Sequence, residues 1–193
     1  MPNFPAFVSY VLLTTFTPGP NNIMAMSYAS KFGFKKSLPL FFGIITGFVI
    51  VFAISNFFSV TLYSIIPTIK PVMTVIGASY ILWLAYKILR SKPGHDAHEE
   101  KHANNFITGM LLQFVNPKLI LYSITTASTF IVPYYTGFFF LVLFTIVLGF
   151  LGLMSIFSWA AFGALFQKFF FGHSTLINTV MALLLVYTAY SLF

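Results

Sequence analysis

Two polar, proline-bearing stretches interrupt hydrophobic segments that are long enough to cross a membrane, one in each half of the chain. The first stretch is Thr17-Pro18-Gly19-Pro20-Asn21-Asn22, and the second is Gln113-Phe114-Val115-Asn116-Pro117-Lys118. Breaking a helix inside lipid is costly, because the freed backbone groups find no water there. Two such breaks, at matching places in the two halves, indicate a binding site built between them.

The composition indicates a chain that lies in a lipid bilayer. Of its 193 residues, 59% are hydrophobic and only 7% are charged, whereas a soluble domain carries roughly 25% charged residues. The chain has no cysteine, which excludes disulfides and thiolate metal sites. The net charge of +7 does not point to nucleic acid, because the few basic residues lie at the ends of hydrophobic segments. We therefore predict an all-α membrane protein.

Six segments hold the roughly 20 apolar residues that a membrane span needs. They run near residues 4–28, 38–58, 71–89, 106–130, 135–160 and 175–193, and the breaks interrupt the first and the fourth. This predicts a first three-helix repeat over 1–90, a cytoplasmic linker over 91–105 and a second repeat over 106–193. Because three is an odd number, the second repeat is inverted relative to the first, as in many secondary transporters.

The basic residues predict how the chain is oriented in the membrane. With six spans, eight of the Lys and Arg residues fall on one side and Lys70 alone falls on the other. The side rich in basic residues is expected to be cytoplasmic, so both termini lie outside. The start of the chain lacks the basic region of a secretory signal, and we expect the first span to be uncleaved. The eight residues are Lys31, Lys35, Lys36, Lys87, Arg90, Lys92, Lys101 and Lys168.

The first break frees backbone acceptors within the membrane. Pro18 and Pro20 have no N–H, so the carbonyls of Thr14 and Phe16 are expected to lose their helical donors. Gly19 between the two prolines tolerates unusual backbone angles. The spacing places this break near the middle of the bilayer, since a helix rises about 1.5 Å per residue. The expectation is a helix that stops and restarts.

Each broken helix is expected to restart next to asparagine residues. Asn21 and Asn22 are predicted to cap the half-helix after the first break. Asn116 followed by Pro117 is typical of an N-cap and a proline at the first helical position, and this proline leaves the Gln113 carbonyl free. Each half-helix N-terminus carries a partial positive charge that points into the membrane.

These features predict a binding site for a small zwitterion. The half-helix N-termini and the Lys118 ammonium would hold a carboxylate, while free carbonyls and asparagine side chains would accept hydrogen bonds from an ammonium group. Two alternatives stay open: the prolines merely kink the helices for packing, and Lys118 snorkels or bonds the freed carbonyls. The candidate substrate-binding residues are Pro18, Gly19, Pro20, Asn21, Asn22, Gln113, Asn116, Pro117 and Lys118.

The linker contains a histidine-rich run that resembles a metal site only superficially. His98 and His102 are four residues apart and would share a face if the run were helical. The run has no apolar frame to confine a metal, so we interpret it as a solvated linker. We predict no metal site, no cofactor and no catalytic residues.

Several motifs together resemble the LysE/RhtB family of amino-acid exporters over essentially the whole chain. They include the Pro-Gly-Pro-Asn-Asn break, Gly43-x-x-x-Gly47, the basic loop Lys31–Lys36, the stretch Ala78–Lys87 and Phe114–Lys118. The resemblance implies a bacterial inner-membrane permease that exports amino acids or close derivatives by antiport with protons. Within the family, the chain is most similar to the cysteine and O-acetylserine exporters.

The chain departs from the family at one position. Many family members carry an acidic residue after the Gly-x-x-x-Gly pattern, where this chain has Phe48, and no Asp or Glu lies in any predicted span. A carboxylate that carries protons is therefore missing, and a cationic substrate would lack a counter-charge. The expected partners are a neutral zwitterionic amino acid, a proton or other coupling ion and the lipid bilayer; nucleic acid is not expected, and a homo-oligomer is left open.

An intramembrane enzyme and a membrane scaffold subunit are the alternative function classes. An intramembrane enzyme needs a nucleophile with an oriented base, but the predicted spans hold no His, Asp, Glu or Cys. A membrane scaffold subunit without transport activity would not need polar breaks in its helices. The sequence therefore favours a transporter.

Overall fold

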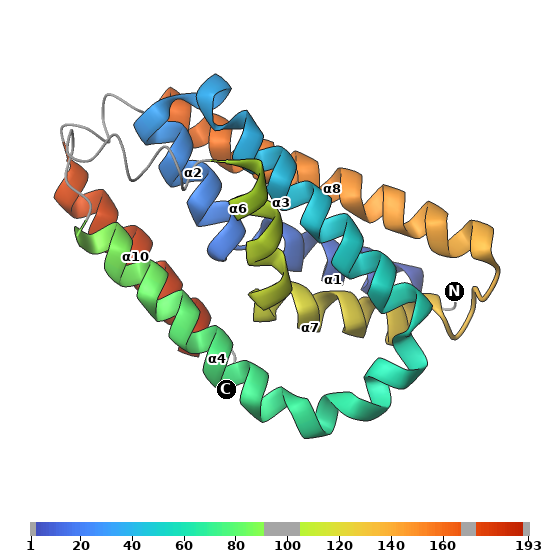
Figure 1. Ribbon diagram of the computed structural model, residues 1–193. Helices are drawn as coiled ribbons and strands as arrows, with labels where there is room; N and C mark the ends of the chain where they lie inside the picture. Colours follow the sequence, from blue (N-terminus) through green and yellow to red (C-terminus); the bar gives the residue numbers. More distant parts are fainter. Residues whose placement is uncertain (1–2, 91–104, 167–172, 191–193) are drawn as a thin grey trace.

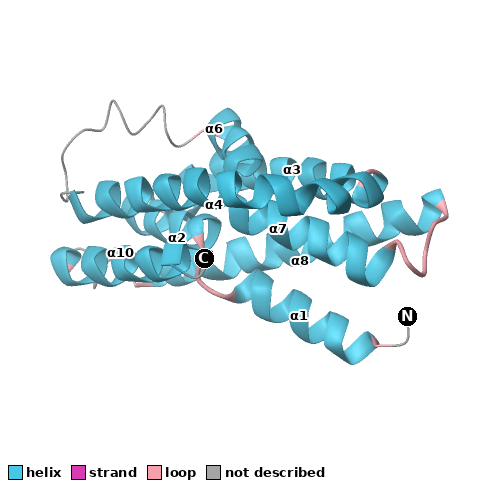
Figure 2. Cartoon of the chain, turned by 90° about the horizontal axis from the view of Figure 1, so that it is seen from below, coloured by secondary structure: helices cyan, strands magenta, loops and turns pink. Residues whose placement is uncertain are grey.

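The computed structural model of this chain describes residues 3–90, 105–166 and 173–190. All regular elements in these ranges are helices, and no strand occurs among them (Figure 2). The prediction of an all-helical protein is confirmed.

The first half of the chain folds into four helices in the described region. They are α1 (Phe4–Phe16), α2 (Pro20–Phe32), α3 (Phe34–Phe57) and α4 (Ser59–Arg90). The predicted first break is present between α1 and α2. Gly33 has a φ of 85°, a conformation that glycine adopts without strain and that allows the sharp turn from α2 into α3.

The third predicted span starts earlier than expected. The sequence predicted a loop up to residue 71, but α4 is already helical from Ser59, so Pro71 lies within the helix. A helix pairs its own backbone groups, which costs less in an apolar environment than a loop with exposed N–H and C=O groups. Hydrophobicity alone could not show where α4 begins, because the segment before Pro71 is less apolar than the rest of α4.

The second half contains the second break. Its elements are α6 (Phe106–Leu111), η1 (Leu112–Val115), α7 (Pro117–Thr125), η2 (Thr126–Ile131), α8 (Phe138–Leu165) and α10 (Ser174–Tyr190). The segment Phe106–Val115 meets Pro117–Ile131 at an angle of 64°. The predicted interruption of this segment is therefore present, and η2 is a π-helical turn that continues α7.

Length and hydropathy identify two described helices, α3 and α8, as able to cross a membrane. The bent pair around Asn116 would be a third span if it is counted as one, and α1 and α10 are apolar but shorter. The described helices thus support a membrane protein with two to three spans, and the arrangement of six spans as an inverted repeat stays a prediction.

The helices pack around two apolar clusters, one on each side of the first break. One cluster joins α2, α3, α4, α8 and α10 through residues such as Ile23, Phe41 and Leu185. The other joins α1, α3, α7, η2 and α8 and includes Val11 and Leu148. Figure 1 shows α10 running along α4, beside the bundle that α3 and α8 form with the broken helices. The break thus lets α1 and α2 pack in different clusters.

Glycines allow α3 and α6 to cross closely. A Cβ atom on Gly43 would collide with the Phe106 carbonyl, and one on Gly47 would lie 2.5 Å from the Met110 carbonyl oxygen. Gly109 on α6 approaches the backbone of α3 in the same way. The Gly-x-x-x-Gly pattern therefore serves close helix packing, and the partner of α3 is the first half of the broken helix.

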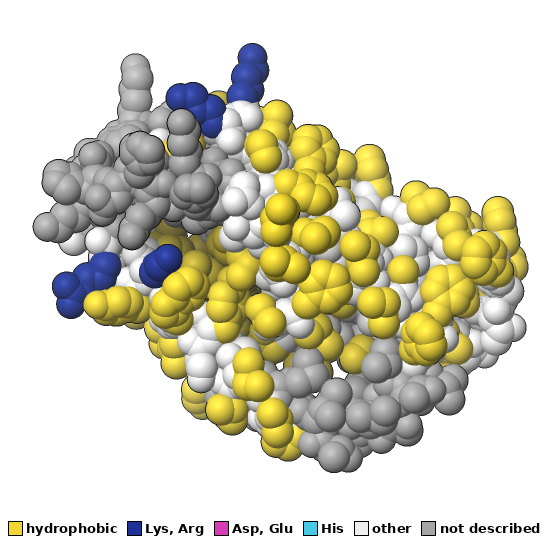
Figure 3. Space-filling view, in the orientation of Figure 1, with side chains coloured by type: hydrophobic (Ala, Val, Ile, Leu, Met, Phe, Trp, Pro, Cys, Tyr) yellow, Lys and Arg dark blue, Asp and Glu magenta, His cyan; other side chains and the backbone are white. Residues whose placement is uncertain are grey.

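The surface suits a lipid environment. Large apolar side chains on α8 point outward, with Phe138 72% and Leu165 82% exposed. In Figure 3, hydrophobic side chains are spread over the described part of the face shown, and the Lys and Arg side chains gather at one end of it. A water-soluble protein rarely exposes so large an apolar surface.

Candidate functional site: two helix breaks that meet

At the first break, the chain becomes extended between α1 and α2. Thr17 ends α1 and its hydroxyl donates to the Thr14 carbonyl at 3.2 Å. Gly19 is the N-cap of α2, and no side chain caps this helix. The prediction that Asn21 and Asn22 cap α2 is therefore wrong. Both lie inside the first turn, where their side chains reach sideways to other segments.

The carbonyls at the end of α1 are satisfied by side chains from elsewhere. Asn22 Nδ2 donates to the carbonyl oxygens of Thr15 and Thr17, both at 2.9 Å. The indole N–H of Trp159 on α8 donates to the Phe16 carbonyl at 3.1 Å. The acceptors that the break exposes thus have donors, as buried carbonyls require.

The second break has the predicted cap. Asn116 is the N-cap of α7, its side-chain oxygen accepts a bond from the Leu119 N–H at 3.4 Å, and Pro117 is the first helical residue. The Gln113 carbonyl was expected to be free, but it accepts the Asn116 N–H at 3.4 Å because the chain tightens into the 3-10 turn η1. This correction removes one predicted acceptor from the site.

Amide side chains join the two breaks directly. Asn21 Nδ2 donates to Gln113 Oε1 at 2.7 Å, and Gln113 Nε2 donates back to Asn21 Oδ1 at 3.1 Å. Asn116 Nδ2 donates to the same Asn21 oxygen at 3.1 Å. Gln113 is fully buried and also bonds the Gly109 carbonyl. The structure therefore brings together residues that lie more than 90 positions apart in the sequence.

Lys118 ties α7 to the first break. Its ammonium donates to the Thr17 carbonyl and the Thr17 hydroxyl, each at 3.1 Å, and to the Pro18 carbonyl at 3.2 Å. These contacts engage all three donors of a lysine. Gly19 leaves room for the side chain, since a Cβ there would lie 2.9 Å from Lys118 Nζ. The alternative that Lys118 bonds carbonyls at the break is confirmed.

Ser155 on α8 completes the polar wall. Its hydroxyl lies 2.8 Å from the Thr15 carbonyl and 3.2 Å from Asn22 Oδ1, both acceptors. The sequence analysis did not include this serine in the site. Its only signal was a hydroxyl in a largely apolar helix, three residues after Gly152.

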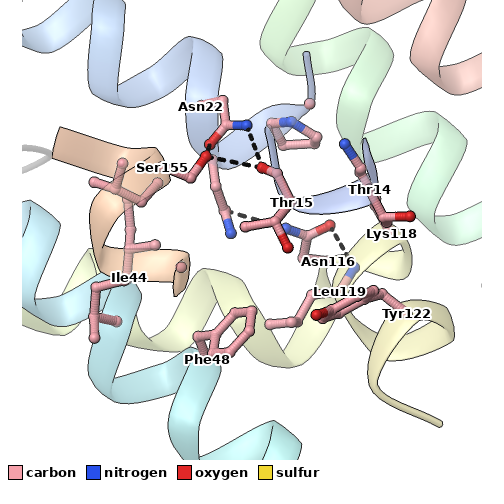
Figure 4. A pocket seen from close by; sticks show the side chains of 16 residues that line it. Thr14, Thr15, Asn22, Ile44, Phe48, Asn116, Lys118, Leu119, Tyr122 and Ser155 are labelled. Atoms are coloured by element: carbon pink, nitrogen blue, oxygen red, sulfur yellow. Dashed lines mark hydrogen bonds between the residues drawn. The ribbon is translucent and has the colours of Figure 1, made fainter. Parts of the chain in front are cut away.

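A pocket lies beside the two breaks, and its cavity volume is about 60 Å³. On the same measure, one water molecule needs roughly 10–15 Å³, so the cavity holds several waters or a small solute. Figure 4 shows the lining side chains converging on it from α1, α2, α3, α7 and α8. Six of the predicted residues line the pocket: Gly19, Pro20, Asn21, Asn22, Asn116 and Lys118.

The other three predicted residues do not line the pocket. Pro18 contributes its carbonyl to Lys118, and Gln113 holds Asn21 from behind. Pro117 packs against Gly77 of α4. The pocket residues absent from the predicted set are Thr14, Thr15, Ile44, Ile45, Phe48, Leu119, Tyr122, Gly152, Ser155 and Ile156. Most are apolar or small, as packing residues are.

Most of the described residues that line the pocket are uncharged. Among the described residues that line the pocket, Lys118 is the only charged one, and its ammonium is already bound by three oxygens. Phe48 lies on the wall, with its ring centroid 6.2 Å from that of Tyr122. The pocket thus combines neutral polar groups on one side with an apolar surface on the other. This is the usual character of a small-molecule site.

The described part of the chain holds no group of three His, Asp or Glu residues placed to bind a metal. His98 and His102 lie outside the described residues, so the interpretation of that run as a linker stays a prediction.

Comparisons with known proteins place the chain in a family. The model of the LysE type translocator family matches residues 12–193. The chain is 39% identical over 188 residues to the cysteine/O-acetylserine efflux proteins of Salmonella typhimurium and Escherichia coli K12, covering 97% of this chain and 96% of each relative. No solved structure matches. The chain belongs to the LysE family of translocators and is a transporter rather than an enzyme.

Proposed function

We propose that this protein exports small neutral amino acids or their close derivatives, of the cysteine and O-acetylserine type, across the bacterial inner membrane. The observation that carries the proposal is the hydrogen-bonded junction of two helix breaks, through Asn21, Gln113 and Asn116. The junction lies beside a pocket whose described lining residues include no acidic one. The two efflux relatives support the substrate class, since their similarity covers nearly the whole chain.

The ends of α2 and α7 provide the groups that a zwitterion needs. Both helices begin at the breaks, where unpaired N–H groups and the helix dipole favour a carboxylate. The Thr14 carbonyl accepts one bond among the described residues, from the Thr17 hydroxyl, and Thr14 lines the pocket. A carbonyl has two acceptor sites, so this one would accept a second bond from a substrate ammonium. Lys118 sets the positive potential of the pocket, and its ammonium bonds uncharged oxygens of Thr17 and Pro18.

The substrate is transported by alternating access around the breaks. Six spans in a 3+3 inverted repeat would place the two breaks at the interface of the repeats, where transporters of this architecture bind their substrates. The repeats cover 1–90 and 106–193, joined by the cytoplasmic linker. The basic side chains at one end of the molecule support the orientation with both termini outside.

Export is driven by the proton gradient in an antiport cycle. The acidic residues of the chain, Asp96, Glu99 and Glu100, are all in the linker, so no carboxylate in the spans carries the proton. A neutral substrate is consistent with this, because it brings no net charge that the pocket must balance.

The test is efflux of radiolabelled neutral amino acids from vesicles that contain the purified protein, with and without a pH gradient. The expected result is flux of cysteine and O-acetylserine that rises with the gradient, and little flux of lysine or arginine. Absence of flux for every amino acid tested would instead favour a scaffold subunit and would reject the proposal.

A further inference from the structure

Two hydroxyl groups on the pocket wall have unused hydrogen-bonding capacity. Thr15 Oγ1 on α1 and the Tyr122 hydroxyl on α7 are buried, and neither has a hydrogen-bond partner within the described residues. The Tyr122 hydroxyl lies near the side chains of Thr15 and Thr126 without forming a bond of proper geometry to either; the Thr126 hydroxyl donates to the Tyr122 carbonyl. Buried polar groups are rarely left in this state, so the pair is suited to a partner that enters the pocket.

The neighbouring polar groups are already occupied. Asn22 and Ser155 bond each other and the end of α1, and Asn116 bonds Asn21. The oxygen of Asn56 is also buried and unpaired, but it does not line the pocket. Thr15 and Tyr122 differ from Asn56 because both of these residues line the same pocket.

Surrounding aromatic rings fix the position of the Tyr122 hydroxyl. The ring of Tyr122 lies 5.9 Å from that of Tyr10, 6.2 Å from Phe48 and 6.1 Å from Phe52, measured between centroids. The Tyr122 side chain is 4% exposed. A hydroxyl held in this way is preorganised for one ligand position.

The backbone of Thr15 is held equally firmly. Its carbonyl accepts bonds from Asn22 at 2.9 Å and from Ser155 at 2.8 Å, so the last turn of α1 is anchored to α2 and α8. Figure 4 shows Thr15 near the centre of the lining side chains, with Phe48 and Tyr122 on the same side of the pocket. The pair therefore presents two fixed hydroxyls next to an apolar wall.

We infer that Thr15 and Tyr122 form the subsite that binds the substrate side chain and selects a short, uncharged side chain with a polar atom, such as a thiol, a hydroxyl or an acetyl ester. The inference rests on the proposed function. The helix ends at the breaks serve the groups common to all amino acids, whereas the Thr15–Tyr122 pair faces the part that differs between them. A charged side chain finds no counter-charge there, and an apolar one leaves both hydroxyls unpaired.

The test compares substrates of similar shape that differ in the polar atom. Purified Tyr122→Phe and Thr15→Val proteins in proteoliposomes are assayed for flux of L-cysteine and of L-2-aminobutyrate, in which a methyl group replaces the thiol. For each variant we expect the ratio of cysteine to 2-aminobutyrate flux to fall about tenfold relative to the wild type. The reason is that the site has lost a hydroxyl that hydrogen-bonds the polar atom of the substrate. The matched controls are Tyr187→Phe, at an exposed position, and Thr179→Val, at a half-buried one. Both lie on α10, outside the pocket lining, and should leave the ratio unchanged.

The remaining outcomes show whether the inferred subsite or the proposed function is wrong. Measurable flux with an unchanged ratio in both variants overturns the inference, and so does an equal loss of flux for both substrates. Tyr122→Phe should unfold at no lower a temperature than the wild type, since it removes only an unpaired oxygen; a marked drop would indicate a structural role and contradict the inference. Absence of any amino-acid flux in the wild type would instead overturn the proposed function.

Discussion

Asn21 and Gln113 exchange hydrogen bonds through both of their amide groups, at 2.7 and 3.1 Å, although 92 residues separate them in the sequence. One follows the first break and the other precedes the second. An amide that both donates to and accepts from the same partner is satisfied in a single geometry. The pair therefore fixes how the two broken helices meet.

This pair should show energetic coupling. We expect Asn21→Ala and Gln113→Ala each to destabilise the protein, and the double variant to cost about 1 kcal/mol less than the sum, because either single change already breaks the reciprocal bonds. The measurement is a double-mutant cycle of unfolding in detergent micelles. Strict additivity would mean that the pair contributes nothing beyond its separate parts.

Removing the ammonium of Lys118 should loosen the first break. Lys118→Met keeps most of the side-chain volume but deletes three hydrogen bonds from a charged donor, so we expect a loss of about 2 kcal/mol in the free energy of unfolding. Lys35→Met, at an exposed position of α3, is the control and should change stability little. Equal stability of the two variants would contradict the role of Lys118 as a tie between helices.

The close crossing of α3 and α6 should not tolerate a methyl group. Gly47→Ala places a Cβ 2.5 Å from the Met110 carbonyl oxygen, and we expect it to destabilise the protein by about 1–3 kcal/mol. Gly152→Ala is the matched control within a helix, because its nearest neighbours would be 3.7 Å away. Thermal unfolding of the purified proteins separates the two, and a Gly47→Ala protein as stable as the control would refute the crossing.

The serine on α8 should matter for transport, whereas its neighbour should not. Ser155 bonds the end of α1 and Asn22, but Ser158 bonds only the Met154 carbonyl of its own helix. We expect Ser155→Ala to lower stability by about 1 kcal/mol and to lower amino-acid flux, and Ser158→Ala to do neither. Parallel flux and unfolding measurements on the two variants decide this, and equal flux would remove Ser155 from the site.

The sequence predicted those parts of the fold that depend on local chemistry. Proline and glycine placed both breaks, and the Asn116-Pro117 pair identified the start of α7, because these residues constrain the backbone directly. The Gly43-x-x-x-Gly47 pattern indicated a close helix contact, because glycine lets a neighbouring backbone approach. Its partner, α6, depends on tertiary packing and could not be read from the pattern.

Other features of the site depend on which segments meet in space. Asn21 and Asn22 are suitable caps by residue type, yet the chain uses them to bond Gln113 and the end of α1. Likewise, Thr15 and Tyr122 look like ordinary residues of apolar helices, and only their position beside the cavity reveals them. The start of α4 was missed because the segment before Pro71 is less apolar than the rest of the helix, and hydropathy alone does not distinguish such a helical segment from a loop.

The measurement that tests the central claim most directly is transport by variants of the two breaks. Asn22→Ala, Asn116→Ala and Lys118→Ala are reconstituted at equal amounts, with Lys35→Ala as the control, and efflux of labelled cysteine and O-acetylserine is followed. If the breaks form the substrate site, all three variants insert into the membrane but lose export, while the control exports like the wild type. Wild-type flux through all three would contradict the account.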